Sequence, residues 1–275
     1  MKTSSNQEIN FLQILKPNED GEDYVVGDIH GHFDKLDAKL EEIGFDYDND
    51  RLIVVGDLID RGPKSEKFME YLEKDWFYTV RGNHEDFLVN CLGYMLNEIP
   101  MEEYVFNITW NTWMGNGGRW FERIFDDTPD EDKPALIRSY YDKVAALPFF
   151  MEIPYRDKKV GIVHAELREL DSWNDINTIA DGGNIPEHTD LGIILRDALW
   201  SRTRFERYAN TLGYTDQHDS EIIQDVDAIF CGHTPIVDYE NEAPLTIGNN
   251  HYIDTYVYGT FENNFQLIKL SEFFA

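Results

Sequence analysis

The sequence predicts an α/β protein, and three features of the pattern support that prediction. Short apolar segments rich in valine and isoleucine, such as residues 52–55, have the character of buried strands. Several of them end at a glycine that is followed at once by a polar residue, as Gly56 is followed by Asp57. The segments between them repeat apolar residues with a helical period, which is typical of helices that connect parallel strands.

The first half of the chain alternates strands and helices. We expect an edge strand at residues 11–15, then strands at 24–26, 52–55 and 76–80, with helices at 33–43, 64–72 and 87–96. Asp28 and Asp57 are 29 residues apart, and Asp57 and Asn83 are 26 apart. Both spacings match one strand-plus-helix repeat of roughly 30 residues. The three strand ends can therefore face one pocket.

The second half is expected to complete the same domain. Residues 97–150 contain a helix at 135–147 and are predicted to form a helical cap, most of it structural filler. A β-hairpin at 149–155 and 160–163 leads to His164, and a strand at 227–231 leads to His233. Residues 168–195 are expected as loops, and strands in the tail, around 252–255 and 265–270, as part of a second sheet. We therefore expect residues 1–275 to form one domain.

The composition limits the possible partners. The chain has 275 residues, of which 42% are hydrophobic and 14% aromatic, which excludes a disordered protein. A net charge of -29 argues against binding nucleic acid. Two cysteines without a CxxC pair suit a reducing compartment, the polar first ten residues do not resemble a signal peptide, and no apolar run reaches the ~20 residues of a membrane span. We expect a cytoplasmic protein without a membrane partner; its oligomeric state stays open.

Six side chains with oxygen or nitrogen donors follow the predicted strand ends: Asp28, His30, Asp57, Asn83, His164 and His233. We expect Asp57 to bridge two divalent metal ions, with Asp28 and His30 on one ion and the other three donors on the second. Without a thiolate, this donor set favours manganese, with iron or zinc as alternatives. Two ions ~3.5–4 Å apart suit in-line displacement at phosphorus, because they acidify a shared water and stabilise the departing oxygen.

Charged residues next to these donors fit a phosphate substrate. Arg61 and Arg81 lie within a few residues of a ligand, and a guanidinium group matches phosphate oxygens, although a salt bridge is the simpler role for each alone. In a chain of net charge -29, arginines at glycine turns are better explained by an anionic substrate. His84 is placed to protonate a leaving group, and Asp60 is placed to orient it.

Three blocks are specific in combination: Gly27-Asp28-Ile29-His30-Gly31, Gly56-Asp57-Leu58-Ile59-Asp60-Arg61-Gly62 and Arg81-Gly82-Asn83-His84-Glu85. Together with residues 163–165 and 231–235, they resemble the metal-dependent phosphoprotein phosphatases among the calcineurin-like metallophosphoesterases. The resemblance is nearest to the small bacterial and bacteriophage-lambda-type serine/threonine phosphatases. It extends to residues 116–118, 200–202 and 252–255.

The resemblance implies a central β-sandwich of two mixed sheets flanked by helices. It also implies the ligand set given above, with His84 as the general acid paired to Asp60. Arg202 would join Arg61 and Arg81 as a phosphate clamp. The chain departs from the family pattern at Tyr256, where glycine is usual and where a phenol could narrow the pocket.

The function that these features favour is hydrolysis of phosphoserine or phosphothreonine in proteins or peptides, with phosphotyrosine as a further candidate substrate. A dinucleoside polyphosphate hydrolase on the same scaffold is an alternative. That branch of the family lacks the Asp-Arg pair in the second block and has Asn-His-Asp in the third, so Asp60-Arg61 and Glu85 favour the phosphatase. Small-molecule or nucleic-acid-end phosphates are further possible substrates. A catalytically silent binding module is disfavoured, because every expected ligand, the acid and the three arginines are present.

Overall fold

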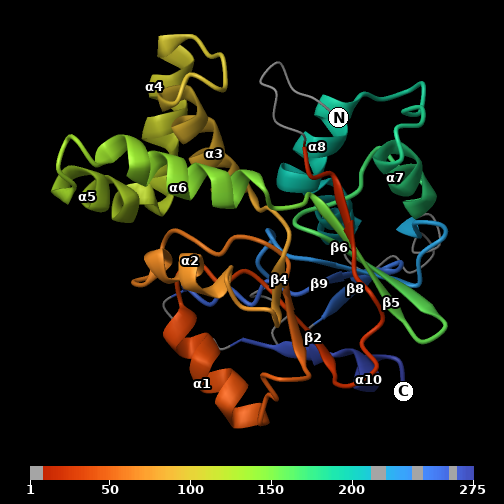
Figure 1. The fold of residues 1–275 in the computed structure, drawn as a ribbon. Helices are drawn as coiled ribbons and strands as arrows, with labels where there is room; N and C mark the ends of the chain where they lie inside the picture. The colour runs from red at the N-terminus through yellow and green to blue at the C-terminus, as the bar shows by residue number, and fades with distance from the viewer. Residues whose placement is uncertain (1–8, 212–220, 237–243, 260–264) are drawn as a thin grey trace.

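The computed structural model describes residues 9–211, 221–236, 244–259 and 265–275. Two β-sheets lie at the centre and helices lie against their outer faces (Figure 1). Both sheets contain parallel and antiparallel pairs, so the prediction of two mixed sheets flanked by helices is confirmed. No helix in the described part of the chain is long and apolar enough to cross a membrane.

The first sheet has four strands in the order β10 (Leu267–Lys269), β2 (Asp23–Val26), β3 (Arg51–Val54) and β4 (Phe77–Thr79). Strands β2, β3 and β4 are parallel, and their register pairs Val26 with Val54 and Val54 with Thr79. The carboxyl ends of the three strands are therefore level, and the residues that follow them emerge at one edge of the sheet.

The second sheet has six strands in the order β1 (Leu12–Ile14), β5 (Phe150–Tyr155), β6 (Lys158–Val163), β7 (Ala228–Cys231), β9 (Asn250–Tyr252) and β8 (Leu245–Ile247). Strands β5 and β6 form the expected hairpin, and β1 is an edge strand as expected. Strand β6 is parallel to β7, with Ile162 opposite Phe230, so these two ends are also level.

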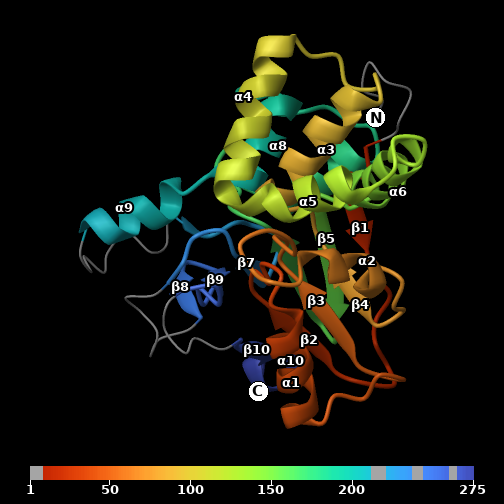
Figure 2. The same cartoon turned by 90° about the vertical axis from the view of Figure 1, so that its left-hand side faces the viewer.

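Apolar side chains fill the space between the two sheets, and further apolar side chains cover the outer face of each sheet. Val25, Ile53 and Val55 of the first sheet pack in one cluster with Met151 and Ile162 of the second. On the outer face of the first sheet lie α1 (Phe33–Ile43), η1 (Ser65–Lys67), α2 (Phe68–Tyr71) and α3 (Asn83–Met95). On the outer face of the second lie α7 (Trp173–Ala180), α8 (Leu191–Trp200) and α9 (Thr203–Thr211), with α9 extending to one side in Figure 2.

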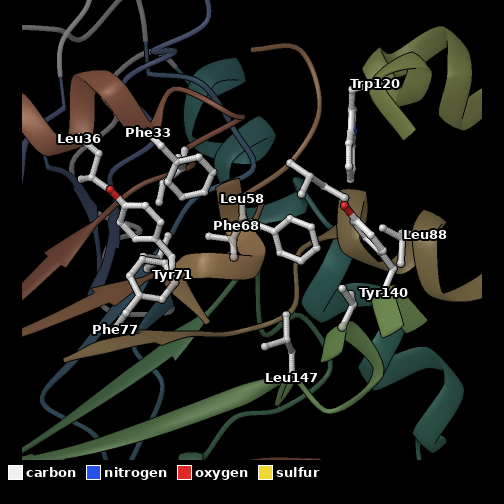
Figure 3. Packing of buried hydrophobic residues seen from close by; sticks show 14 of the residues in the cluster. Phe33, Leu36, Leu58, Phe68, Tyr71, Phe77, Leu88, Trp120, Tyr140 and Leu147 are labelled. Atoms are coloured by element: carbon white, nitrogen blue, oxygen red, sulfur yellow. The ribbon is translucent and has the colours of Figure 1, made fainter. Parts of the chain in front are cut away.

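The helical cap consists of α4 (Glu103–Trp113), a π-helical turn η2 (Met114–Gly118), α5 (Arg119–Asp127) and α6 (Lys133–Ala145). Its apolar residues belong to the same cluster as α1 and α2. Figure 3 shows Phe68 between Tyr71 on one side and Trp120 and Tyr140 on the other. The cap therefore shares a core with the first sheet.

Several elements differ from the sequence predictions. Strand β10 joins the first sheet, antiparallel to β2, and not the second sheet as expected for the tail. The segment predicted as loops contains α7, whose Trp173 packs on the hairpin glycine Gly161. Helix α3 begins at Asn83, four residues earlier than predicted, and the Glu85 carboxylate accepts a hydrogen bond from the Gly82 backbone N–H at this end of the helix. The expectation that the first ten residues are not a signal peptide concerns mostly residues 1–8, which lie outside the described ranges.

Candidate metal centre

The structure brings the six expected donors together where the two sheets meet. Asp28 and His30 follow β2, Asp57 follows β3, and Asn83 begins α3 just after β4. His164 and His233 follow β6 and β7 of the second sheet. All six side chains are buried. Level strand ends in both sheets therefore converge on one buried site.

Asp57 lies between two groups of donors and offers one oxygen to each. Its Oδ2 lies 3.5 Å from His30 Nε2, which is 3.8 Å from Asp28 Oδ2. Its Oδ1 lies 3.4 Å from His164 Nε2. The Asn83 side-chain oxygen lies 2.8 Å from that nitrogen and 3.0 Å from His233 Nδ1. This is the arrangement in which one carboxylate can bridge two cations.

Hydrogen bonds to backbone carbonyls fix which ring nitrogen of His30 and of His164 faces the site. His30 Nδ1 lies 2.9 Å from the Ile59 carbonyl oxygen, and His164 Nδ1 lies 2.9 Å from the Val55 carbonyl oxygen. Because a carbonyl only accepts, both Nδ1 atoms carry the proton and both Nε2 atoms present a lone pair. Burial lowers the pKa of both histidines and lowers that of His233 to about 2, so all three are neutral. Neutral imidazole is the form that binds a metal.

The carboxylates of the site also fit bound cations. Burial would raise the pKa of Asp57, but its neighbours, among them His84 and the His84 backbone N–H, lower it. Burial, together with the charges of Asp254 and Asp57, raises the pKa of Asp28, and burial raises that of Asp254 to about 6. Asp254 Oδ2 is buried and has no hydrogen-bond partner among the described residues. A cluster of buried carboxylates with an unpartnered oxygen is stabilised by positive charge.

Several of the site residues have an unusual backbone conformation. His30, Asp57, Asp60, Arg61 and His233 all have φ between 45° and 73°, in the left-handed region that non-glycine residues rarely adopt. Such residues cost of order 1–3 kcal/mol each and persist where the surroundings hold them. The strain is therefore concentrated in the loops that carry the donors.

Glu85 supplies much of the support for these loops. Its two carboxylate oxygens accept hydrogen bonds from the backbone N–H groups of Asp57, Leu58 and Gly82, at 2.8, 2.8 and 2.9 Å. The ends of β3 and β4 are thereby tied to one fully buried side chain. The motif that contains Glu85 does not by itself indicate this role.

A second carboxylate, Asp60, is bound to His84. Asp60 Oδ2 lies 2.6 Å from His84 Nδ1, and both side chains are buried. Burial alone would lower the pKa of His84, but the charges of Asp57 and Asp60 outweigh it and raise that pKa. The indole N–H groups of Trp113 and Trp120 also donate to Asp60, which sequence reasoning missed.

Either of two residues could complete the donor group around His30 and Asp57. Ligand atoms of His30, Asp57 and His84 all lie within 4.8 Å of one another, as do those of Asp57, His164 and His233. We favour Asp28 over His84 in the first group, because in spite of its burial the charges of Asp57 and Asp60 raise the pKa of His84, and a protonated imidazole cannot bind a metal.

Comparison with known proteins decides the family. The family model for calcineurin-like phosphoesterases matches residues 24–237. The chain belongs to this family. The resemblance expected from the three sequence blocks is thereby confirmed. Metallophosphoesterases use a binuclear centre of divalent metal ions, and the donor groups around Asp57 fit such a centre.

Named relatives include two kinds of phosphoesterase. The chain is 30% identical over 233 residues to serine/threonine-protein phosphatase 1 of Salmonella typhimurium, covering 84% of this chain and 85% of that protein. Serine/threonine-protein phosphatase 2 of the same organism is 29% identical over 232 residues, with 84% and 86% covered. A 64-residue stretch, 22% of this chain and 23% of the relative, is 44% identical to a symmetrical bis(5'-nucleosyl)-tetraphosphatase of Hamiltonella defensa.

The three arginines expected to clamp phosphate have different surroundings in this metallophosphoesterase. Arg61 Nη1 lies 2.7 Å from His30 Nε2, and Arg202 donates to the His233 carbonyl oxygen at 3.1 Å. Both guanidinium groups therefore lie beside the donors. Arg81 instead donates to the Ala145 carbonyl oxygen at 2.7 Å and packs over the ring of Phe149 at 4.5 Å. Arg81 also forms an ion pair with Asp86 of α3 at 3.6 Å, and its role as part of a phosphate clamp stays a prediction.

The aromatic ring of Tyr258 packs against Arg61 and His30. Its centroid lies 4.3 Å from the Arg61 guanidinium carbon and 4.6 Å from the His30 ring centroid. Tyr256, which the sequence singled out, packs on Tyr258 at 4.3 Å and has a φ of 55°. That left-handed conformation explains why glycine would suit this position. Tyr258 therefore borders Arg61, which sequence reasoning missed, and the narrowing of the pocket by Tyr256 stays a prediction.

Glu166 supports the loop that carries Arg202. It lies two residues after His164 and is buried. Its carboxylate accepts hydrogen bonds from Ser201 Oγ and the Arg204 N–H, at 2.9 and 3.0 Å, and from the Phe205 N–H and Tyr252 hydroxyl, at 3.0 and 2.8 Å. Glu166 thus caps the start of α9 from another element, where a negative charge is favourable.

We expect Asp57→Asn to lose bound metal, because the amide cannot give an anionic oxygen to each of two cations. The measurement is manganese per chain after equilibration and gel filtration. The matched control is Asp50→Asn, which changes another buried carboxylate that binds backbone N–H groups outside the site. Full manganese occupancy in the Asp57 variant would show that Asp57 does not bridge.

We expect Glu166→Gln to weaken the binding of inorganic phosphate to the manganese-loaded protein about 10-fold, because weaker hydrogen bonds to Ser201 and the Arg204 N–H would let Arg202, which lies between them, move away from the position in which it would hold phosphate. Titration calorimetry measures this affinity. Glu152→Gln is the control, because Glu152 is also buried and accepts from Trp173 Nε1, but on the far face of the sheet. Equal phosphate affinity in wild type and Glu166→Gln would separate Glu166 from the placement of Arg202.

Proposed function

We propose that this metallophosphoesterase is a serine/threonine protein phosphatase that hydrolyses phosphomonoesters with two divalent cations, manganese being the ion that the donor set favours. The observation that carries the proposal is the position of Asp57, with one oxygen toward each donor group and with His84 and Asp60 beside it. The relatives named as serine/threonine-protein phosphatases, which match over most of the chain, support the protein substrate.

The proposed metal ligands are Asp28, His30 and Asp57 for one cation and Asp57, Asn83, His164 and His233 for the other. When bound, the cations lower the pKa of a water and balance charge at phosphorus. Arg61 and Arg202 lie beside the donors, and their guanidinium groups would hold the phosphate oxygens. This orients the ester so that its leaving oxygen faces His84.

The reaction breaks the bond from phosphorus to the leaving oxygen and forms a bond from phosphorus to the oxygen of water. One proton of that water stays on the product phosphate, and the other goes to solvent, from which His84 is protonated again. His84 would give its Nε2 proton to the leaving oxygen, which departs as an alcohol. Asp60 would keep His84 charged and oriented by accepting from Nδ1. A seryl or threonyl alkoxide is a poor leaving group, so the proton matters most for those substrates.

A dinucleoside polyphosphate hydrolase is the second candidate, because a 64-residue stretch of the chain is 44% identical to such an enzyme. The discriminating experiment assays the manganese-loaded protein on phosphoserine peptides, p-nitrophenyl phosphate and diadenosine tetraphosphate. We expect kcat/KM to be at least about 10-fold higher on phosphoserine peptides than on diadenosine tetraphosphate, a difference of ~1.4 kcal/mol. The reverse preference would replace the proposed function with the second candidate.

We expect His84→Ala to lower kcat on phosphoserine peptides by about 10²–10⁴-fold, the usual effect of losing a positioned proton donor. Manganese content should stay at the wild-type level, because His84 is proposed as an acid and not as a ligand. His188→Ala, which removes an exposed histidine bonded to the Glu169 carbonyl oxygen, serves as the control. Loss of one manganese ion in the His84 variant would instead identify His84 as a ligand.

A further inference from the structure

We infer that Trp113 and Trp120 are positioning residues for leaving-group protonation, because their indole N–H groups fix the Asp60 carboxylate that orients His84. The inference rests on the proposed function, in which His84 is the acid. Trp113 is the last residue of α4, and Trp120 is the second residue of α5. Both therefore belong to the helical cap, which sequence reasoning treated mostly as structural filler.

Three donors surround the Asp60 carboxylate. Trp120 Nε1 donates to Oδ1 at 2.6 Å, and Trp113 Nε1 lies 3.2 Å from Oδ1 and 3.0 Å from Oδ2. His84 Nδ1 lies 2.6 Å from Oδ2. All four side chains are buried, and Asp60 itself is fully inaccessible to solvent. With donors from three separate helices, the carboxylate cannot rotate without breaking a hydrogen bond.

Indole N–H groups suit this task chemically. A buried carboxylate without donors would take up a proton, since isolated charge is costly inside a protein. An indole donates a hydrogen bond but cannot accept or carry the mobile proton. Trp113 and Trp120 can therefore stabilise Asp60 as an acceptor without competing with His84. His84 Nδ1 then stays on Asp60, and Nε2, which lies 3.9 Å from Asp57 Oδ2, faces the metal centre.

The cap is packed tightly against the loop that carries Asp60. Gly117 of the π-helical turn has a φ of 115°, and a Cβ at this position would lie 2.4 Å from the Arg61 backbone nitrogen and 3.1 Å from Asp60 Cβ. Trp113 stacks on Phe121 at 5.5 Å, and Trp120 contacts Phe68 edge to face at 6.1 Å. Packing thus holds both rings, so removing the N–H alone tests the hydrogen bonds.

The test compares two substrates that differ in their need for an acid. The serine oxygen of a phosphoserine peptide leaves as an unstable alkoxide unless it is protonated, whereas p-nitrophenyl phosphate releases a stable phenolate. In Trp120→Phe and Trp113→Phe, we expect the ratio of kcat on the peptide to kcat on p-nitrophenyl phosphate to fall about 10-fold. Manganese content should match wild type. The control is Trp110→Phe, which alters the same cap core 5.6 Å from Trp113.

A double variant checks that the effect passes through Asp60. In an Asp60→Asn background, Trp120→Phe should lower the ratio no further, because the carboxylate it supports is already absent. Where a phenylalanine variant does not fold, 3-benzothienylalanine at position 120 keeps the ring shape and replaces the N–H with sulfur.

If the wild type is active and the tryptophan variants keep its ratio of kcat values on the two substrates, the proposed function stands and this inference is wrong. Equal losses on both substrates would also overturn it, because they would indicate a merely structural role. A manganese-loaded wild type that hydrolyses neither substrate would overturn the proposed function and the inference together.

Discussion

The burial of the Asp57 carboxylate between neutral imidazoles is the constraint on which the rest of the structure depends. Its two oxygens face different donor groups, and Asp28 and Asp254 add further buried carboxylates nearby. Negative charge packed this closely is unfavourable inside a protein unless cations balance it. The protein therefore needs a fold that forces these side chains together and bound cations that make their proximity favourable.

The fold provides that force through strand ends and the groups that support them. Parallel strands in both sheets end level with one another, so each sheet delivers donors to the same place. The donor loops adopt left-handed conformations, which would relax without support. Glu85 ties the β3 and β4 loops through backbone N–H groups, and Glu166 does the same for the loop of Arg202. Glu85 and Glu166 therefore support the site indirectly, through the backbone of its loops.

The outer helices are not passive covers. The cap shares its apolar core with α1 and α2, and it places two indole donors on Asp60. Helix α9 begins directly after Arg202, and the Glu166 carboxylate accepts a hydrogen bond from the Arg204 N–H in its first turn. Helices on opposite sides of the sandwich therefore hold two parts of the proposed chemistry: the acid on one side and a phosphate-binding arginine on the other.

The sequence contained local signals for much of this arrangement. Glycine followed by a donor, repeated at strand-plus-helix spacing, identified Asp28, Asp57 and Asn83, which the structure brings together. The contacts of Trp113, Trp120 and Tyr258 depend on packing between distant segments, which periodicity cannot reveal. Arg81 and Arg61 have the same local setting beside a glycine, yet Arg81 donates to Ala145 because α6 ends beside it. The pairing of β10 with β2 is also long-range.

The most direct test of the account is anomalous X-ray scattering from crystals grown with manganese. The account predicts two manganese peaks on either side of the Asp57 carboxylate, one near Asp28 and His30 and the other near Asn83, His164 and His233. A single peak, or peaks that Asp57 does not contact, would contradict the claim that this carboxylate bridges two cations.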